Sequence, residues 1–266
     1  MDGAASVGAP GRLSSSSDTG YGGLMSNETQ TTTEYTWKGR TGPFTVSLTP
    51  GVFRPTSTSV TLAEAMEIHD GDVVVDVGCG SGVLAFVAAR LKAAKSYGCD
   101  LSSEAVKAAR ENARRLGVSA VTEFRVGNLL EPVRDIRADV IIGDVSGIPD
   151  PIALATGWFP DGIGGGPTGA ELPVAMLEGV QHCLKPGGRL YLPTGTIQDE
   201  STVLETARRL FGAENVKKLI ERQFPLPGSI LESDKVARLI SDGLVDLKRK
   251  GSRLLWRLAV WSCRQA

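Results

Sequence analysis

The sequence has no long apolar run and no excess of charge of either sign. No segment approaches the roughly 18 consecutive apolar residues of a membrane-spanning helix, and the N-terminus lacks the charged and then apolar pattern of a signal peptide. The formal net charge of -1 over 266 residues gives no global electrostatic reason to bind nucleic acid or a membrane. We therefore expect a cytoplasmic protein that has neither a membrane nor a nucleic acid as its partner.

Cysteine and histidine are scarce and widely spaced. The four cysteines and two histidines include no Cys-x-x-Cys pair, so they support neither a metal site nor a disulfide framework. Cys79 lies near the start of an expected helix, a position that can lower the pKa of a thiol. Because small residues of any kind are tolerated in such turns, a structural role is favoured for Cys79.

The main sequence feature is a glycine-rich turn between an expected strand and an expected helix. Residues 73–82 read Val-Val-Val-Asp-Val-Gly-Cys-Gly-Ser-Gly and are followed by an Ala-rich segment. The β-branched run predicts a strand buried on both faces, and the Ala-rich segment predicts a helix. Glycines let a ligand lie against the backbone while free N–H groups at the helix start point toward it, so the pattern predicts a ligand-binding site.

Two common phosphate-binding motifs are absent from this turn. The dinucleotide motif requires Gly-x-Gly-x-x-Gly, but Val83 stands at its third glycine position. The P-loop requires Gly-Lys-Ser/Thr, which the turn lacks. The carboxylate of Asp76, just before the turn, would repel a pyrophosphate and could receive an ammonium group. These features favour a zwitterionic ligand.

The stretch Asp-Val-Gly-Cys-Gly-Ser-Gly resembles the first motif of the class I S-adenosylmethionine (SAM) dependent methyltransferases. The resemblance implies an α/β, Rossmann-like fold with a seven-stranded, mostly parallel sheet in the order 3-2-1-4-5-7-6, one antiparallel strand near its end, and helices on both faces. It also implies SAM as the cofactor. Residues of the turn would hold the methionine moiety of SAM: Asp76, Gly78, Cys79, Gly80, Ser81 and Gly82.

The next two strands carry the expected nucleoside contacts. A strand over residues 95–99 leads to Asp100, whose carboxylate can accept both hydroxyl groups of a ribose. A third strand over residues 121–126 leads to Asn128, where the resembling family commonly has an acidic residue that holds the adenine amino group. An asparagine can do this through its side-chain carbonyl. The neighbouring Leu101 and Leu129 are expected to contact the cofactor as well.

A fourth strand, beginning at residue 138, runs into the expected acceptor loop. Because active sites of open α/β sheets lie at the carboxyl ends of the strands, Asp144 and Ser146 should lie next to the methyl group of SAM, with Asp144 contacting both cofactor and acceptor. In relatives that methylate glutamine or adenine this loop reads Asn/Asp-Pro-Pro-Tyr/Phe, but here it reads Asp-Val-Ser-Gly. Glutamine methylation is therefore not implied. Asp144 could hold an amine, remove its proton or cap the loop.

The first 61 residues form two parts before the SAM-binding domain, which we place at residues 62–266. Residues 1–32 have almost no large apolar side chains, which predicts a disordered tail. Residues 33–61 predict a short strand at 44–48 and then a loop before a helix over 60–69, forming either a hairpin that covers the core or a lid. Gly-Val-Phe-x-Pro resembles the corresponding segment of the release-factor glutamine and ribosomal-protein methyltransferases, which implies acceptor contacts from Phe53, Thr56, Ser57 and Thr58.

The C-terminal half predicts further alternating elements. Residues 149–169 read as a long glycine-rich loop that contributes Trp158 to the acceptor site. A helix should follow over 172–184, a tight turn over 185–188, and a strand over 189–193. The remainder predicts a helix (201–211), a strand (216–224), a short helix (233–240) and a final strand (253–263). Basic residues around Trp256 and Trp261 are better explained as solvated charges than as a nucleic-acid patch.

The predicted reaction is methyl transfer from SAM to a nitrogen or oxygen nucleophile on a small molecule or peptide side chain. The sulfonium is a good leaving group, so the protein mainly has to align donor and acceptor, and no metal is needed. Two alternatives remain open. One is an enzyme in which the amine of SAM attacks its own side chain, giving a cyclic amino acid and methylthioadenosine. The other is an inactive SAM-binding interaction module.

Overall fold

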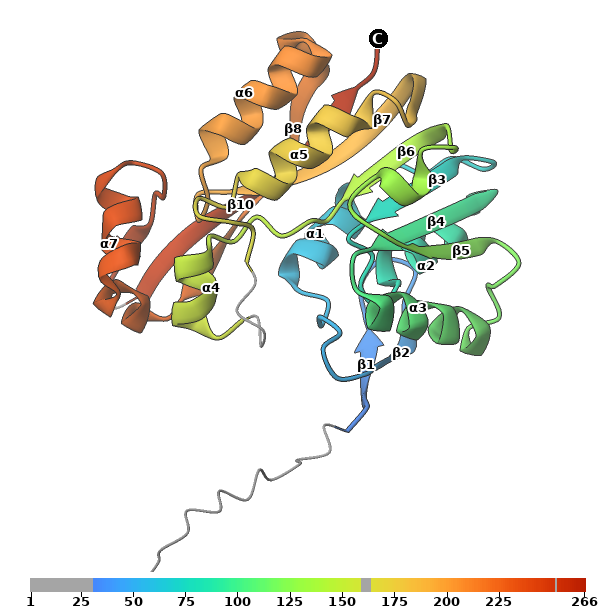
Figure 1. Ribbon diagram of the computed structural model, residues 1–266, viewed down its shortest axis with the longest axis horizontal. Coiled ribbons are helices and arrows are strands. Elements are labelled where there is room, and N and C mark those ends of the chain that lie inside the picture. Colours follow the sequence, from blue (N-terminus) through green and yellow to red (C-terminus); the bar gives the residue numbers. More distant parts are fainter. Residues whose placement is uncertain (1–30, 159–163, 252) are drawn as a thin grey trace, which may run out of the picture. The chain divides into compact units, whose positions relative to one another are not determined.

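The computed structural model describes residues 31–158, 164–251 and 253–266 (Figure 1). Residues 1–30 of the tail expected over 1–32 lie outside the described residues. The strands are β1 (Thr33–Trp37), β2 (Phe44–Leu48), β3 (Val73–Val77), β4 (Lys95–Asp100), β5 (Thr122–Val126), β6 (Ala138–Gly143), β7 (Leu184–Gly195), β8 (Val216–Leu226), β9 (Lys248–Lys250) and β10 (Arg253–Arg264). The α-helices are α1 (Ser57–Ala65), α2 (Val83–Arg90), α3 (Ser103–Arg115), α4 (Asp150–Thr156), α5 (Glu171–Val180), α6 (Glu200–Phe211) and α7 (Asp234–Ser241). Short 3-10 helices are η1 (Glu131–Val133), η2 (Ala213–Asn215) and η3 (Gly228–Glu232).

The main sheet has the predicted topology. Its strand order is β5-β4-β3-β6-β7-β10-β8, with the short β9 pairing with β10. Counted along the chain without β9, this is the order 3-2-1-4-5-7-6. The pairs from β5 to β7 are parallel, and β10 runs antiparallel to both β7 and β8. The carboxyl ends of β3, β4, β5 and β6 therefore meet at one edge of the sheet.

Alternating residues of the central strands bury opposite faces of the sheet. Val74 and Ile142 belong to a core that includes α1, α2 and α3, whereas Val75 and Ile141 belong to a second core that includes α5 and α6. All four side chains are fully buried. Because both faces are covered, the strands read as continuous apolar runs, which is the pattern that predicted them.

The strands β1 and β2 form an antiparallel hairpin that packs into the first core. Trp37 is fully buried and its ring lies 6.2 Å from that of Phe44. The aromatic contacts continue from Phe44 to Phe86 of α2 at 6.3 Å and from Phe86 to Phe124 of β5 at 5.8 Å, both edge to face. The hairpin is therefore fixed to the main domain through aromatic packing.

Three helices differ from the prediction. The helix expected over 172–184 is α5, which ends at Val180, and Leu184 already begins β7. The helix expected over 60–69 spans Ser57–Ala65, because Thr56 caps its start and Met66 has extended backbone angles. The segment 149–169, expected to be a loop, contains α4, which begins after Pro149 and ends at Gly157 with positive φ. Proline at a helix start and glycine at its end are ordinary helix signals, but in a short segment they also resemble loop punctuation. Residues 159–163 of this segment lie outside the described residues.

The segment expected as a turn over 185–188 is a bulge inside β7. Leu184 pairs with Ala138 of β6, whereas Arg189 pairs with Val140, so four residues of β7 oppose one residue of β6. The backbone of Gly187 and Gly188 hydrogen-bonds Gln265 beyond the end of β10. Pairing beside the long β10 thus keeps this segment within the strand, although its sequence is typical of a turn.

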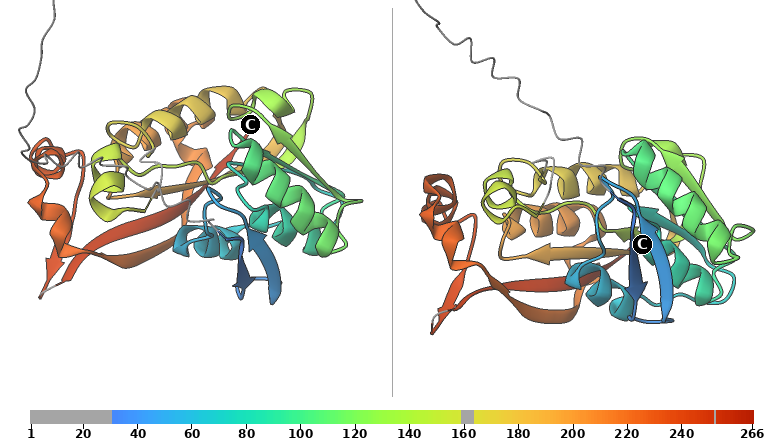
Figure 2. Two further views of the ribbon diagram at one scale, coloured as in Figure 1. Left: turned by 60° about the horizontal axis from the view of Figure 1, so that its bottom comes forward. Right: turned by 90° about the horizontal axis from the view of Figure 1, so that it is seen from below.

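A third core lies beside the main sheet, where β8 and β10 extend toward α7. Figure 2 shows these strand ends projecting with α7 at the side of the molecule. The cluster joins α4, α7 and the ends of β8 and β10 through Ile152, Ile197, Leu226, Ile230, Val236, Leu239, Val245, Leu254, Trp256 and Leu258.

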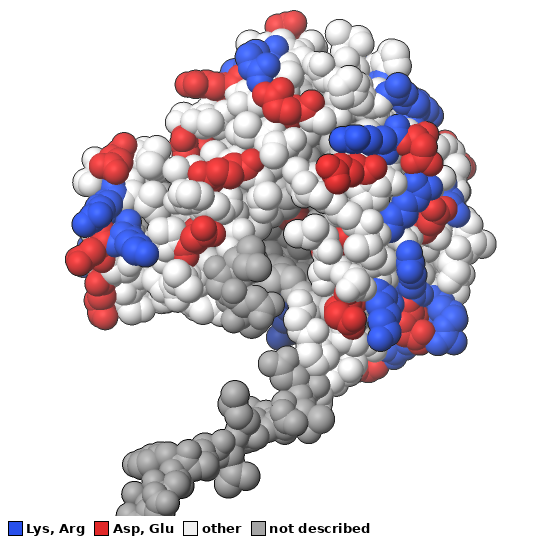
Figure 3. Space-filling view, in the orientation of Figure 1, with Lys and Arg blue, Asp and Glu red and all other residues white. Residues whose placement is uncertain are grey.

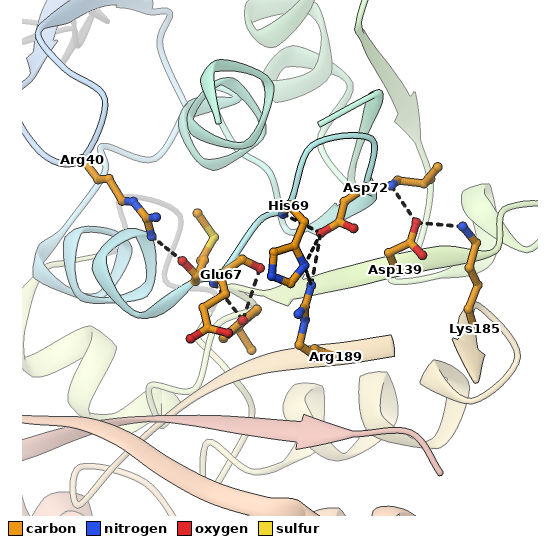
Figure 4. A network of polar contacts seen from close by, with 10 residues as sticks. Arg40, Glu67, His69, Asp72, Asp139, Lys185 and Arg189 are labelled. Carbon is orange, nitrogen blue, oxygen red and sulfur yellow. Dashed lines mark hydrogen bonds and ion pairs between the residues drawn. The ribbon is translucent and has the colours of Figure 1, made fainter. Parts of the chain in front are cut away.

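At the amino ends of the strands, polar contacts fasten the segment between α1 and β3 (Figure 4). Asp72 accepts hydrogen bonds from the His69 backbone at 2.9 Å and from Arg189 at 3.1 Å. The Tyr191 hydroxyl accepts from the Glu67 backbone N–H at 2.8 Å. Arg40 donates to the carbonyls of Ala63 and Met66. The carboxyl end of α1 is therefore held by β7 and by the hairpin segment.

The fully buried side chain of Asn112 in α3 joins three parts of the fold. It accepts from Ser47 N at 2.7 Å and donates to Ser47 O at 3.0 Å and Ser81 O at 3.2 Å. We predict that Asn112→Ala lowers the free energy of unfolding by about 2–4 kcal/mol, because it leaves buried backbone groups unpaired. Chemical denaturation tests this. Glu111→Ala, which removes only an exposed ion pair with Arg114, should leave the midpoint nearly unchanged, and an equal loss in both variants would contradict the prediction.

Candidate active site

The glycine turn brings the end of β3 against the loop that follows β6. Gly78, Gly80 and Gly82 all have positive φ, at 76°, 50° and 89°. A Cβ on Gly78 would lie 2.8 Å from the Asp144 carbonyl oxygen, and one on Gly82 would lie 2.6 Å from the Phe86 ring. These two glycines are thus required both by backbone angle and by space.

Asp76 lies beneath this turn and is 1% exposed. Its Oδ2 accepts from Ala85 N of α2 at 3.1 Å, whereas Oδ1 is buried without a hydrogen-bond partner. Burial raises the pKa of the Asp76 carboxyl well above its ordinary value, and the nearby charges of Asp144 and Asp100 raise it further. An unpaired carboxylate oxygen among other acids fits a cationic ligand group, such as the ammonium group of SAM.

Asp100 lies at the end of β4, beside the turn. Its carboxylate accepts from Gly80 N and from Ser102 N, both at 2.9 Å. Leu101, which follows it, is 73% exposed although it is a large apolar residue. These two residues suit a nucleoside. The Asp100 carboxylate can bind the ribose hydroxyls, and the exposed side chain of Leu101 can contact the base.

The residues after β5 lie close to this position. Gly127 N donates to Asp100 O at 3.0 Å, so the ends of β4 and β5 are joined. Asn128 is exposed and precedes Leu129, whose φ of 47° is uncommon for a non-glycine residue. The structure therefore places Asn128, Leu129 and Leu101 at neighbouring strand ends, where an adenine could lie between them.

Asp144 directly follows β6 and faces α1. It is half-buried, and its Oδ2 accepts from the Ser59 hydroxyl at 2.9 Å. Burial raises the pKa of Asp144 to about 6, and the Ser59 hydrogen bond partly opposes that rise. Sequence reasoning missed Ser59. The only local signal for it was the Thr-x-x-Ser pattern of a helix cap, which says nothing about a contact 85 residues away.

The four other residues expected near the acceptor in this region lie at the start of α1 and in the preceding loop. Thr56 caps α1, and Ser57 and Thr58 form its first turn. Phe53 is partly exposed, and its carbonyl oxygen would lie 3.9 Å from a Cβ on Gly80. The loop from Phe53 to Thr58 therefore passes over the glycine turn.

The loop after Asp144 packs against a second glycine-rich loop. Gly165 N donates to Ile148 O at 2.6 Å, and Asp150 N donates to Gly166 O at 2.8 Å. The hydroxyl of Ser146 is buried without a hydrogen-bond partner. Trp158, in contrast, packs against the third core.

A further buried polar group lies behind the acceptor loop. Gln198, 5% exposed, follows β7, and its side-chain amide lies where a Cβ on Gly147 would project. Its Nε2 has no hydrogen-bond partner. Sequence reasoning also missed Gln198, because its proximity to Gly147 depends on how β6 and β7 pair.

All four cysteines are buried and free. Burial raises the pKa of the Cys79 thiol well above its ordinary value, and the charge of Asp76 raises it further. This environment disfavours the thiolate, so the helix start does not make Cys79 reactive.

In the view of Figure 3, most Lys and Arg side chains lie toward the right of the molecule, over α3 and the neighbouring strands, and at the left over α7. Within the described ranges no helix is long and apolar enough to cross a membrane, and no group of His, Cys, Asp and Glu could hold a metal ion.

A Rossmann-like sheet with acids at three neighbouring strand ends around a glycine turn defines the class of SAM-dependent methyltransferases. The family model described as "Methyltransferase domain" matches residues 68–240. The chain therefore belongs to the methyltransferase domain family, and SAM is the cofactor of that class.

The chain is similar to several curated proteins of this class. It is 30% identical over 178 residues to the release factor glutamine methyltransferase of Moorella thermoacetica, covering 62% of each chain. It is 37% identical over 105 residues to the ribosomal protein L11 methyltransferase of Edwardsiella ictaluri, covering 38% of this chain and 35% of the relative. The chain thus spans less than two thirds of either relative.

Solved structures share the fold. The 16S rRNA N2 G1207 methyltransferase of T. thermophilus, in complex with AdoMet and guanosine, has a TM-score of 0.57 at 15% identity, covering 88% of this chain and 51% of that one. The tRNA m1G37 methyltransferase of M. jannaschii has a TM-score of 0.55 at 14% identity, covering 90% of this chain and 56% of that one.

The raised pKa of Asp144 makes a stability prediction for the ligand-free protein. The carboxyl ionises near pH 4 when unfolded and at about 6 when folded, so its ionisation lowers stability progressively from about pH 4 to 6, and the full loss is present above pH 6. Asp144→Asn should therefore stabilise the protein by about 1–3 kcal/mol at pH 8, a gain that disappears toward pH 4.

Thermal unfolding across this pH range tests the Asp144 prediction. Asp135→Asn is a control of opposite sign, because the Arg125 hydrogen bond lowers the pKa of Asp135. That variant should lose a little stability at neutral pH and none at low pH. A pH-independent effect of Asp144→Asn would contradict the prediction.

The unpaired amide of Gln198 makes a second stability prediction. Gln198→Met keeps a similar volume and removes a buried donor without a partner, so it should raise the free energy of unfolding by about 1 kcal/mol in the ligand-free protein. Urea denaturation measures this change. Gln181→Met provides the control, because Gln181 donates to Leu210 O at 2.6 Å and its loss should not stabilise. Destabilisation by Gln198→Met would mean that its amide has a partner in solution.

Proposed function

We propose that this protein transfers the methyl group of SAM to a nitrogen or oxygen nucleophile on a small molecule or peptide side chain. The main observation that supports the proposal is the position of Asp144. This acid lies against the glycine turn, and its Oδ2 already has a donor from Ser59. It supplies a hydrogen-bond acceptor beside the place where the cofactor motifs put the reacting end of SAM.

The chain's own residues would divide the work as follows. Asp76 receives the ammonium group, Asp100 the ribose hydroxyls, and Asn128 the adenine edge. SAM, when bound, supplies an electrophilic methyl group on a positively charged sulfur. Asp144 is ionised above about pH 6, so at neutral pH it can accept a hydrogen from the nucleophile and orient its lone pair. Alignment and exclusion of water supply most of the rate enhancement.

The charges at the site favour an uncharged or cationic acceptor. Asp76, Asp100 and Asp144 converge on the glycine turn, and Asp76 feels the charge of both others. A polyanion approaching these acids would be repelled. The two structural relatives are named for tRNA and rRNA, and the two sequence relatives for proteins. The acids support a small molecule or peptide over a nucleic acid.

The basic residues of the C-terminal segment have different surroundings. Arg257 pairs with Glu200 at 2.5 Å and with Glu221 at 3.5 Å. Trp256 is buried in the third core. Lys248, Arg249 and Lys250 are exposed, as expected for solvated charges on a strand.

Self-cyclisation of SAM is the second candidate, because the acceptor loop lacks the prolines and aromatic residue of the resembling enzymes. A product assay separates the two. Purified protein should convert SAM to S-adenosylhomocysteine only when an extract supplies the acceptor. Methylthioadenosine formed from SAM alone would overturn methyl transfer and support cyclisation. SAM binding without any product across extracts would support an inactive binding module.

The cofactor assignment predicts that Asp100→Asn weakens SAM binding by about 10- to 100-fold, because one charged hydrogen-bond acceptor of the ribose is lost. Isothermal titration calorimetry with SAM measures it. Asp135→Asn, an exposed acid near η1, is the matched control and should bind as the wild type does. Equal affinity of both variants would remove Asp100 from the cofactor site.

A further inference from the structure

Ser59 is enclosed where α1 meets the acceptor loop. It is 7% exposed, and its hydroxyl lies 2.9 Å from Asp144 Oδ2. The same hydroxyl lies 3.4 Å from the backbone N of Thr56, which completes the cap of α1. The Ser59 hydroxyl therefore contacts both the backbone at the start of α1 and the carboxylate of Asp144 in the acceptor loop.

The two contacts fix which atom carries the proton. A backbone N–H can only donate, so the Thr56 contact uses a lone pair of the Ser59 oxygen. The single hydroxyl proton is then free to point to Asp144, and Oδ2 accepts it when the carboxyl is ionised. Oδ1 of Asp144 has no contact with Ser59 and is available to accept a second hydrogen.

We propose that Ser59 is a positioning residue that holds Asp144 Oδ2, so that Oδ1 faces the methyl acceptor and takes a hydrogen bond from its N–H or O–H group. This inference rests on the proposed function and adds to it. It states that the acceptor carries a hydrogen on its nucleophilic atom or next to it, and that one oxygen of Asp144 receives that hydrogen.

The hydrogen bond between Ser59 and Asp144 depends on the position of the loop that precedes α1. The carboxyl end of α1 is held by Arg40, while its start depends on the cap that Thr56 and Ser59 form together. Displacement of the loop at Phe53–Thr58 would break the cap and release the Ser59 hydroxyl from Asp144. Ordering of this loop and orientation of the acid are therefore linked.

The charges that face Asp144 come from neighbouring strand ends. Asp76 of β3 couples to Asp144 directly, Asp100 of β4 lies across the turn, and Ser59 of α1 is the donor on the other side. Since the Ser59 hydrogen bond lowers the pKa of Asp144, its loss raises that pKa further above 6.

The first test compares the affinities of SAM and S-adenosylhomocysteine between pH 5 and 9 by calorimetry. The two ligands share their amino acid and nucleoside groups, so their affinity ratio reports the charge near sulfur and cancels the titration of Asp76. In the wild type, the affinity for SAM divided by the affinity for S-adenosylhomocysteine should increase as the pH rises through about 6. In Ser59→Ala the midpoint should move upward by about one pH unit. Asp144→Asn should make the ratio independent of pH.

Three further variants separate positioning from general damage to α1. Ser59→Thr keeps the hydroxyl and should restore the wild-type midpoint. Ser59→Cys keeps the volume with a weak donor and should shift it, which covers the case in which Ser59→Ala does not fold. Thr61→Ala removes a hydroxyl that bonds only Ser57 O within α1, at 2.7 Å, and should not shift it.

A carbon-13 NMR titration of the Asp144 carboxyl in ligand-free protein gives a readout that does not depend on the cofactor. It should show the same upward shift in Ser59→Ala. An unchanged midpoint in Ser59→Ala and Ser59→Cys, with SAM binding intact, would overturn the role of Ser59. Failure of the wild type to bind SAM would instead overturn the proposed function, while the NMR titration would still decide whether Ser59 controls Asp144.

Discussion

The candidate site depends on three carboxylates that the fold brings together where β3, β4 and β6 end. Asp76, Asp100 and Asp144 lie around one glycine turn, where burial and mutual repulsion oppose ionisation of Asp76. Among the described residues, backbone N–H groups and the Ser59 hydroxyl donate to these acids and offset the repulsion. A positively charged ligand would reduce this repulsion. The protein should therefore be less stable without its ligand than with it.

The rest of the molecule holds these acids in place. Strands with fully buried residues on both faces, such as Val74 and Val75, leave no freedom of register, since a shift by one residue would exchange the two cores. Asn112 ties the hairpin to the turn, and the contacts around Asp72 at the opposite edge fix the segment after α1. Hydrogen bonds therefore join the sheet to its surroundings at both ends of the strands.

The sequence predicted what depends on local pattern and on parallel-sheet topology. The glycine turn and the position of Asp100 could be predicted from the residues, because β-branched runs indicate the strands and the carboxyl ends of parallel strands meet at one edge. The strand order was implied by the resemblance to the class I methyltransferases and not by the residues themselves. Ser59 and Gln198 could not be predicted, since each acts through a partner distant in the chain. The helix α4 was missed because its prolines and glycine also signal a loop.

The acceptor loop shows how specificity can change on an unchanged cofactor site. Where resembling enzymes have two prolines and an aromatic residue, this chain has Val145, Ser146 and Gly147. A Cβ on Gly147 would lie 2.4 Å from Gln198 Oε1, so a larger residue at this position would displace the Gln198 amide. A planar group stacked on an aromatic ring is thereby replaced by buried hydroxyl and amide groups without protein partners. These two groups are free to hydrogen-bond a methyl acceptor, which is the proposed basis of acceptor selection in this loop.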